Sequence, residues 1–345
     1  MSHSRPDLTL LPADARAYIE ELEAELAGLR AEWQGEADDD SLPALAPDEP
    51  PTTAQVIVMS TSGQAKRTAR HLYSRQRRAG MGVFDLETPA NDPIALLTLA
   101  DESDTLILLT AQARAFRLPV ANLPATPVRG RGLGVGGLLG LKPDERPALL
   151  FPDLAGSYVV ILTDTGNLRW YSAAVFGRNL TPGITLWHAP DFGAPVAACW
   201  ATASTELFVA TRQGRAIRFP FREVPTQGCS AIRLSDGDKT VALTAIRPDS
   251  GVFLLDAEGK GTIRQMGGFA ANKTPGSGGK IAMSTDRLVA ARTVEPADDV
   301  FLLSRLGKII RFSAGEVPPK EGAVQGVACM SLRGDECVAL GRAVP

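Results

Sequence analysis

VFLLSRLGKIIRF, residues 300–312, places an apolar run before a short polar turn and a second strand-like run after it. A short apolar run bounded by turn residues is typical of a buried β-strand. Gly307 lies in the turn, where a tight hairpin commonly needs a residue with positive φ. The stretch therefore predicts a β-hairpin.

Related stretches recur along the chain, so that the pattern occurs six times in all. The other copies are VIVMSTSGQAKRT (56–68), LILLTAQARAFRL (106–118), VVILTDTGNLRWY (159–171), LFVATRQGRAIRF (207–219) and VFLLDAEGKGTIR (252–264). The residues that mark the turns are Gly63, Ala113, Gly166, Gly214, Gly259 and Gly307, at spacings of 50, 53, 48, 45 and 48 residues. Ala113 is the marker that is not glycine, and we expect a slightly different turn there.

A period near 50 residues with several short strands per unit predicts a β-propeller with one blade per copy. Between the copies run stretches such as LPATPVRGRGLGVGG (123–137) and NKTPGSGGK (272–280), which we expect to be loops because Gly and Pro interrupt any helical period. The sequence thus predicts an all-β, six-bladed propeller over residues 54–345, with about four strands per blade.

The segment before the propeller has a different character. Residues 13–33 predict an amphipathic helix, because Ile19, Leu22, Leu26, Leu29 and Trp33 follow a heptad seam. A seam this short is marginal for an isolated coiled coil. The helix of residues 1–33 therefore either docks on a domain or forms a homodimer through residues 15–33. Residues 34–53 are acidic and rich in proline, and we expect an extended or disordered linker.

Charge is distributed unevenly along the chain. The formal net charge of −3 divides into −10 for residues 1–55 and +7 for residues 56–345. A basic domain behind an acidic leader favours a polyanionic partner. The leader itself either competes with that partner for the basic surface or serves solubility alone.

Other classes of function find little support in the sequence. The four cysteines form no CxxC pair, the three histidines are far apart, and GxSxG and HExxH do not occur. GRGLGVGG (130–137) lacks the crossover helix and acidic residue of a dinucleotide site. We expect no cofactor and no metal. Without a signal peptide or a membrane span, we expect a cytoplasmic, nucleoid-associated protein.

RQRRAGMG, residues 75–82, concentrates three arginines and two glycines in the first repeat. Gln76–Gly82 resembles the gyrase box, usually QRRGGKG, of the C-terminal domain of the gyrase A protein. The VxxTxxGxxxR hairpins and the repeat length support the same resemblance, which covers about residues 54–345. Ala79 and Met81 depart from the box, where the family has glycine and lysine.

The resemblance implies a six-bladed β-pinwheel whose basic edge binds and bends duplex DNA. In gyrases this wrapping sets the handedness of strand passage, and the box is needed for it. Arginine forks suit phosphate oxygens, and we expect the glycines to let backbone amides approach the same phosphates. The candidate DNA contacts around the box are Lys66, Arg70, Arg75, Gln76, Arg77, Arg78, Gly80 and Gly82, and those in comparable later loops are Arg129, Arg131, Arg178, Lys273, Lys280 and Lys320. For the later loops, ordinary solvated surface charge is an equal alternative.

A second set of arginines has one common place in the repeat. Each lies four residues after a turn marker, at Arg67, Arg117, Arg218 and Arg311. Arginines repeated at one blade position commonly cap strand ends or pair with a carboxylate of a neighbouring blade, so we expect a structural role for them.

The function that these observations favour is sequence-independent binding and bending or wrapping of duplex DNA. The chain would act as an architectural protein or as an accessory to a type IIA topoisomerase. We do not expect an enzyme, because the strand-cutting half of gyrase A is absent and Tyr18, Tyr73, Tyr158 and Tyr171 lack the context of a cleavage nucleophile. The alternative is a protein-interaction propeller with a degenerate box, and Met81 in place of lysine favours it.

Overall fold

The computed structural model describes residues 12–37, 49–154, 156–269 and 274–344. The chain forms two units, Met1–Ala46 and Pro47–Pro345. The first unit contains helix α1 (Ala13–Ala37), which confirms the predicted helix and continues beyond residue 33. Leu22, on the expected seam, is 40% exposed, and self-association through residues 15–33 stays a prediction. The linker expected at residues 34–53 lies largely outside the described residues. No described helix has the length and apolar character needed to cross a membrane.

All six predicted hairpins are present in the described part of the second unit. Each pairs two antiparallel strands across a tight turn. The pairs are β1 (Ala54–Ser60) with β2 (Gln64–Ala69), β6 (Thr105–Thr110) with β7 (Arg114–Pro119), β11 (Tyr158–Thr163) with β12 (Asn167–Ser172), β15 (Glu206–Thr211) with β16 (Arg215–Pro220), β19 (Gly251–Asp256) with β20 (Lys260–Gln265), and β23 (Asp299–Ser304) with β24 (Lys308–Ser313).

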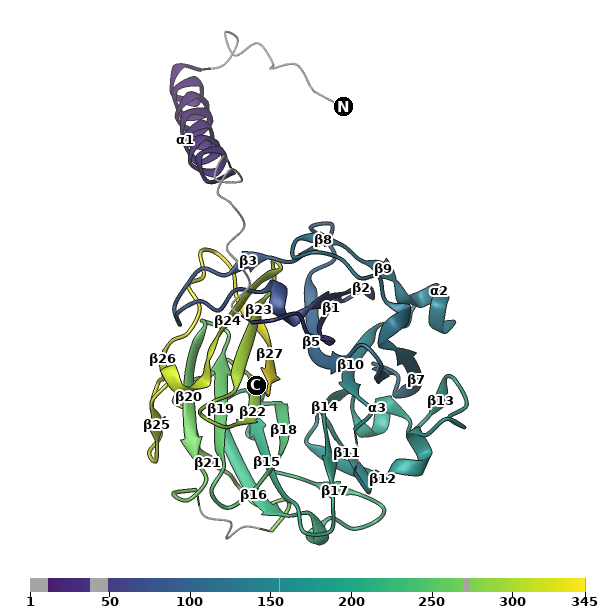
Figure 1. The fold of residues 1–345 in the computed structure, drawn as a ribbon. Helices are drawn as coiled ribbons and strands as arrows, with labels where there is room; N and C mark the ends of the chain where they lie inside the picture. Colours follow the sequence, from purple (N-terminus) through teal and green to yellow (C-terminus); the bar gives the residue numbers. More distant parts are fainter. Residues whose placement is uncertain (1–11, 38–48, 155, 270–273, 345) are drawn as a thin grey trace. The chain divides into compact units, whose positions relative to one another are not determined.

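A third strand adds to the first strand of each hairpin and forms the inner edge of the blade. These inner strands are β5 (Ile94–Asp101), β10 (Pro147–Pro152), β14 (Pro195–Ala201), β18 (Thr240–Ile246), β22 (Leu288–Val294) and β27 (Cys337–Ala343). Each contacts the inner strand of the blade before it and of the blade after it, and β27 contacts β5. The blades therefore close into a ring (Figure 1), and their inner strands line a central channel.

The fourth strand of each blade is very short and comes from a later part of the chain than its hairpin, except in the last blade. In blades one to four these outer strands are β9 (Leu133–Gly134), β13 (Ile184–Thr185), β17 (Cys229–Ser230) and β21 (Lys280–Ile281). In blade five, β25 (Pro319–Lys320) and β26 (Val327–Ala328) both pair with β20. In blade six, β3 (Val83–Phe84) returns from the start of the propeller to pair with β24 and close the ring.

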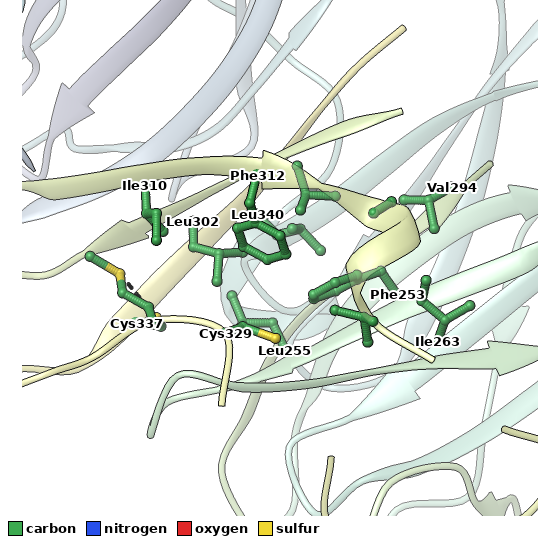
Figure 2. Close-up of a cluster of buried hydrophobic side chains, with 14 residues drawn as sticks. Phe253, Leu255, Ile263, Val294, Leu302, Ile310, Phe312, Cys329, Cys337 and Leu340 are labelled. Carbon is green, nitrogen blue, oxygen red and sulfur yellow. Dashed lines mark hydrogen bonds between the residues drawn. The ribbon is translucent and has the colours of Figure 1, made fainter. Parts of the chain in front are cut away.

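Hydrophobic cores lie between neighbouring blades. One of them combines Phe253 and Leu255 from blade five with Leu302, Phe312 and Leu340 from blade six (Figure 2). Another joins Val56 and Val58 of blade one to Phe301 and Leu303 of blade six. Burying one such side chain contributes about 1.5–3 kcal/mol, so each interface of this kind stabilises the ring.

Two local expectations are wrong. Ala113 has φ of 59° and its N–H donates to Thr110 O at 2.8 Å, which is the geometry that Gly63 makes with Ser60 O at 3.1 Å. The turn at Ala113 is therefore the same as the others, and alanine occupies the left-handed conformation. The stretch 123–137 is not all loop, because a short helix, α2 (Val135–Leu139), begins within it.

Candidate nucleic-acid interface

Residues 75–82, called the box loop from here on, leave blade one and run along blade six. The N–H of Gln76 donates to Arg311 O at 2.8 Å, and the N–H of Ala79 donates to Cys329 O at 2.8 Å. Ser331 N–H donates to Gly80 O at 2.9 Å before the chain enters β3. The backbone of the box loop is thus fixed to β24 of blade six and to the segment that follows β26 on the edge of blade five.

The three arginines of the box loop have different surroundings. Arg75 pairs with Asp299 at 2.9 Å, although its side chain is 48% exposed. Arg78 donates from Nη1 to Ala328 O at 3.0 Å, while its N–H donates to Glu316 Oε2 at 2.9 Å. The side chain of Arg77 is exposed and makes no hydrogen bond or ion pair within the described residues. Arg77 therefore offers a complete guanidinium fork to a ligand.

The glycines of the box loop serve its packing. Gly82 has φ of 73°, and a Cβ atom there would lie 2.6 Å from Ile309 O. At Gly80 a Cβ atom would lie 2.6 Å from Gln76 Oε1. The amides also have internal partners, since Gly80 N–H donates to Arg77 O at 3.2 Å and Gly82 N–H to Gln76 Oε1 at 3.3 Å. The expectation that these amides approach phosphate is therefore wrong, because they hydrogen-bond within the box loop.

The last glycine of the box has a counterpart in every repeat. Each counterpart precedes an outer strand and contacts the backbone two residues after the turn marker of the blade that it joins, at Gly132, Gly183, Gly228, Gly279 and Gly326. For example, a Cβ atom on Gly279 would lie 2.6 Å from Ala216 O, and one on Gly326 would lie 2.7 Å from Gly261 O. The box is therefore a specialised form of a joint that each blade uses.

Residues 126–132 form the most similar of these joints and lie 50 positions after the box loop. Thr126 N–H donates to Arg67 O at 3.0 Å, as Gln76 does to Arg311 O. Arg129 takes the place of Ala79 with φ of 62°, and Arg131 takes the place of Met81 with 89% of its side chain exposed. The cation missing at Met81 is thus present in the next blade. The spacing of 50 residues between the first two turn markers, Gly63 and Ala113, is the sequence feature that indicates this correspondence of Arg131 to Met81.

A direct connection joins the two loops. Strand β4 (Leu86–Glu87), just after the box loop, pairs in parallel with β8 (Gly130–Arg131). Glu87 also lies 3.4 Å from Arg131 Nε, a contact between two exposed side chains that contributes little to stability. The arginines of the two loops are therefore held on adjoining blade edges.

The remaining edge cations are spread over further blades. Arg178 precedes β13, Lys280 belongs to β21 and Lys320 belongs to β25, and all three are exposed. Lys273 lies outside the described residues. The segment PTQGCS (225–230), which leads into and forms β17, has no basic residue. The joint that leads into β17 thus has no cation of its own, and the next exposed one along the chain is Arg233.

Lys66 must be removed from the candidate contacts. Its side chain is completely buried, and Nζ lies 2.8 Å from Asp85 Oδ1 and 3.0 Å from Pro127 O. Tyr73 OH donates to the same oxygen of Asp85 at 2.6 Å. Burial lowers the pKa of Lys66, and the opposing field of Asp85 does not offset this completely. Lys66 therefore anchors the segment that follows the box loop.

Arg70 is also largely occupied. It pairs with Glu49 at 3.0 Å, and only 14% of its side chain is exposed. Glu49 simultaneously pairs with Arg311 at 2.6 Å. Burial raises the pKa of Glu49, but hydrogen bonds from Arg311 and Arg70 outweigh it and hold the pKa below its usual value. Arg70 could meet a ligand only after giving up this carboxylate.

The arginines four residues after the turn markers have the expected structural role. Arg67 pairs with Glu102 at 2.9 Å, and Arg117 with Asp153 at 2.7 Å. Arg218 pairs with Glu206 and donates to Met266 O at 2.7 Å. Arg311 pairs with Asp299 at 2.6 Å and donates to Tyr73 O at 3.0 Å. In the third blade Trp170 takes the same place and donates to Val224 O at 3.2 Å.

A closed ring of six blades, with outer strands exchanged between repeats and arginine–glycine loops on the outer edges, defines the β-pinwheel class. Comparison with known proteins specifies the class further. The family described as DNA gyrase C-terminal domain, beta-propeller matches residues 54–95, 104–144, 205–247 and 298–342. The propeller of this chain is a gyrase A C-terminal-domain-like pinwheel, as the resemblance implied.

Curated relatives support this assignment. The gyrase A protein of Mycolicibacterium smegmatis is 27% identical over an alignment of 304 residues that covers 83% of this chain and 36% of that protein. The gyrase A protein of Escherichia coli is 24% identical over an alignment of 294 residues that covers 82% of this chain and 34% of that protein. The chain thus spans about a third of the length of these relatives, and the match lies in their C-terminal part.

Solved structures share the fold. A structure of the DNA gyrase A C-terminal domain matches with a TM-score of 0.76 at 18% identity, over 84% of this chain and all of that chain. The C-terminal domain of DNA topoisomerase IV matches with a TM-score of 0.60 at 16% identity, over 84% of this chain and 93% of that chain.

Proposed function

We propose that the outer edge of the propeller binds and bends duplex DNA without reading its sequence. The observation that carries this proposal is the exposed fork of Arg77, unpaired within the described residues, on one blade edge beside Arg129 and Arg131 on the next. Guanidinium groups on fixed loops contact phosphates, and phosphate contacts position a duplex without specifying its bases. The relatives, gyrase and topoisomerase IV, are enzymes named for their action on DNA, which accords with DNA as the ligand.

The order of the blades suggests a path for the duplex. Exposed basic side chains occur on the edges of blades four, five, six, one and two, at Lys280, Lys320, Arg77, Arg131 and Arg178. On blade three, the segment PTQGCS (225–230) that leads into and forms β17 has no basic residue. We expect the duplex to enter and leave near blade three and to curve around the remaining edges, so that the protein selects deformable DNA and not a base sequence.

A salt titration with a matched variant tests this proposal. If about six phosphates are neutralised, the logarithm of the binding constant should fall with the logarithm of salt concentration at a slope of about −5. Arg77→Ala with Arg131→Ala removes two contacts and should reduce the slope to about −3.5. The double variant should keep its melting temperature, because both side chains are exposed. A flat salt response, or a slope that the double variant leaves unchanged, would contradict the proposal.

We further propose that the protein acts with the catalytic core of a type IIA topoisomerase or as an architectural protein, and does not itself cut DNA. The similarity to gyrase A lies outside its strand-cleaving part, which supports this view. A topology assay on relaxed plasmid separates the two activities. Bound protein should trap writhe that a separate topoisomerase then fixes, whereas the protein alone should leave the plasmid unchanged.

A protein-interaction propeller is the second candidate, and exposed apolar side chains on the outer strands favour it. Phe84 is 39% exposed, Leu133 47%, Ile184 41% and Ile281 49%. If these apolar side chains bind a partner protein, the double variant Arg77→Ala with Arg131→Ala should still bind that protein. The double variant Leu133→Ser with Ile281→Ser should then lose it. DNA binding lost in the arginine variant and kept in the serine variant would favour the DNA proposal.

A further inference from the structure

The central channel contains an arginine whose charge no described residue of the propeller neutralises. In each blade, the residue six positions before the turn marker pairs with one residue of the inner strand. These six partners occupy the same register position on the six inner strands, and we call such a set one level of the channel. They are Thr98, Phe151, Cys199, Thr244, Arg292 and Gly341. Arg292 is the charged member, and within the described residues its guanidinium makes no hydrogen bond or ion pair.

Buried and half-buried arginines normally have partners, because an unpaired charge loses hydration without compensation. Two buried arginines of the hairpins follow that rule, since Arg218 pairs with Glu206 and Arg311 pairs with Asp299. Buried Arg264 lies instead over the ring of Phe269. Arg292 is half-buried, and burial lowers its pKa, with Arg342 acting in the same direction. The nearby Cys199 does not supply a counterion, because burial raises the pKa of its thiol to about 12.

The space around Arg292 suits a small ligand. All six residues of its level line one cavity of about 600 Å³, which falls within the usual size of small-molecule sites. On one side the next level of the channel is a ring of apolar residues, Leu97, Leu150, Ala198, Leu243, Ala291 and Leu340. The cavity therefore has an apolar floor beneath the arginine.

The rest of the cavity lining mixes apolar side chains such as Leu99 and Trp200 with polar ones. Arg342 and Arg247 are part of it, and each already pairs with a carboxylate, Asp298 at 2.6 Å and Glu295 at 2.7 Å. Ser204 and Ser250 add hydroxyl groups to the lining. Among the described residues, these three arginines have two carboxylate partners, Asp298 and Glu295, and Arg292 has none. We propose that the mouth of the central channel binds a small oxyanion, such as free phosphate or a phosphate monoester, through the fork of Arg292.

This site is distinct from the proposed DNA surface, which lies on the outer strands and not on the inner ones. The test uses the full-length protein in buffers of matched ionic strength containing chloride, inorganic phosphate or adenosine monophosphate. Phosphate at about 100-fold above its dissociation constant should raise the melting temperature by roughly 5–10 °C. Phosphate also stabilises proteins by exclusion from their surfaces, so the wild type must be compared with variants in the same buffers.

Arg292→Gln should reduce the phosphate-dependent shift to the part caused by exclusion and remove the heat of binding in calorimetry, whereas the outer-edge control Arg131→Gln should keep the full shift and the heat. Arg292→Lys keeps the charge without the fork and should weaken binding about tenfold, which provides a second variant if glutamine prevents folding. A larger shift with adenosine monophosphate than with phosphate would identify a monoester as the ligand. Equal shifts in wild type and Arg292→Gln, or loss of DNA binding in Arg292→Gln, would overturn the proposal.

Discussion

Ala79 has φ of 68° in the box loop, a left-handed conformation that glycine adopts more easily. For a non-glycine residue this conformation costs roughly 1 kcal/mol or more. Because Ala79 is exposed, Ala79→Gly loses no packing and should raise the melting temperature by about 2–4 °C. Ala113→Gly is the control, since Ala113 is fully buried and the lost methyl contact of about 0.8 kcal/mol should offset the relief. A lower melting temperature for Ala79→Gly would contradict this explanation.

Asp92 stabilises the turn of the first hairpin. Its carboxylate accepts hydrogen bonds from Ser60 Oγ at 2.7 Å, Thr61 Oγ1 at 2.9 Å and Ser62 N–H at 2.8 Å. Burial raises its pKa, but the hydrogen bonds outweigh this and hold the pKa below its ordinary value of 3.8. A carboxyl group with a lowered pKa stabilises the fold fully above the unfolded pKa, and this contribution is lost as the pH falls through the folded value.

We therefore expect Asp92→Asn to destabilise the propeller by about 1–2 kcal/mol at pH 7. The difference from wild type should shrink as the pH falls below about 5, because the unfolded chain then binds a proton at Asp92 while the folded carboxylate, with its lowered pKa, still does not. Urea unfolding at several pH values measures this difference. A difference that stays constant down to pH 3 would show that the charge of Asp92 is not what stabilises the turn.

Residue roles were predictable where the repeat supplied several copies for comparison. Four arginines at one repeat position indicated a structural pairing, and the structure confirms it at Arg67 and Arg311. Lys66 was misassigned because its burial depends on Asp85, which belongs to a segment exchanged between blades. Arg77 and Lys66 look alike in the sequence, since local charge does not reveal which side chain a distant carboxylate neutralises.

The joint between box loop and outer strand is the critical element of the ring. Gly82 has both a positive φ and a backbone neighbour 2.6 Å from the position of a Cβ atom, at Ile309 O. Gly82→Ala should therefore destabilise the protein by about 2 kcal/mol or more and release β3 from β24. Faster hydrogen exchange of the β24 amides would report that release.

Gly136→Ala is the matched control for this prediction. Gly136 lies in α2, where a Cβ atom would have no neighbour within 4 Å. Alanine there should be neutral or stabilise the helix by up to about 1 kcal/mol. If Gly82→Ala and Gly136→Ala have the same melting temperature, the outer joint does not hold the ring together.

Among the elements, the hairpins were predictable and the outer strands were not. A hairpin has two runs of about six residues with a turn glycine, which is enough for a pattern of buried positions to stand out. An outer strand such as β3 or β13 has two residues, so no alternation can be seen in it. Its pairing depends instead on a glycine that lets it approach the neighbouring hairpin, as Gly82 and Gly183 do.

The acidic leader gives a prediction for the whole molecule. Glu49 already pairs with Arg70 and Arg311, which shows how a leader carboxylate can occupy a candidate contact. Tethered acids also compete at an effective concentration that can reach millimolar. Asp38→Asn, Asp39→Asn and Asp40→Asn together should therefore tighten DNA binding at low salt, with a smaller effect at high salt.

The control changes the same number of charges on the propeller, through Asp144→Asn, Asp236→Asn and Asp249→Asn, which are exposed side chains outside the outer strands. Gel shifts at two salt concentrations compare the two triple variants with wild type. Equal tightening in both would show a general effect of net charge. No change in the leader variant would mean that the leader serves solubility.

The closure of the ring by β3 also affects how the protein is made on the ribosome. Val83 pairs with Ile309, so the edge on which β3 rests is synthesised 226 residues later. At roughly 5–20 residues per second, β3 waits on the order of 10–50 seconds before its partner emerges. A long unpaired strand would invite association with other nascent chains during that time, but two residues present too little edge to template it. The shortness of β3 thus protects the incomplete chain, and a strand made with the first repeat completes the last blade.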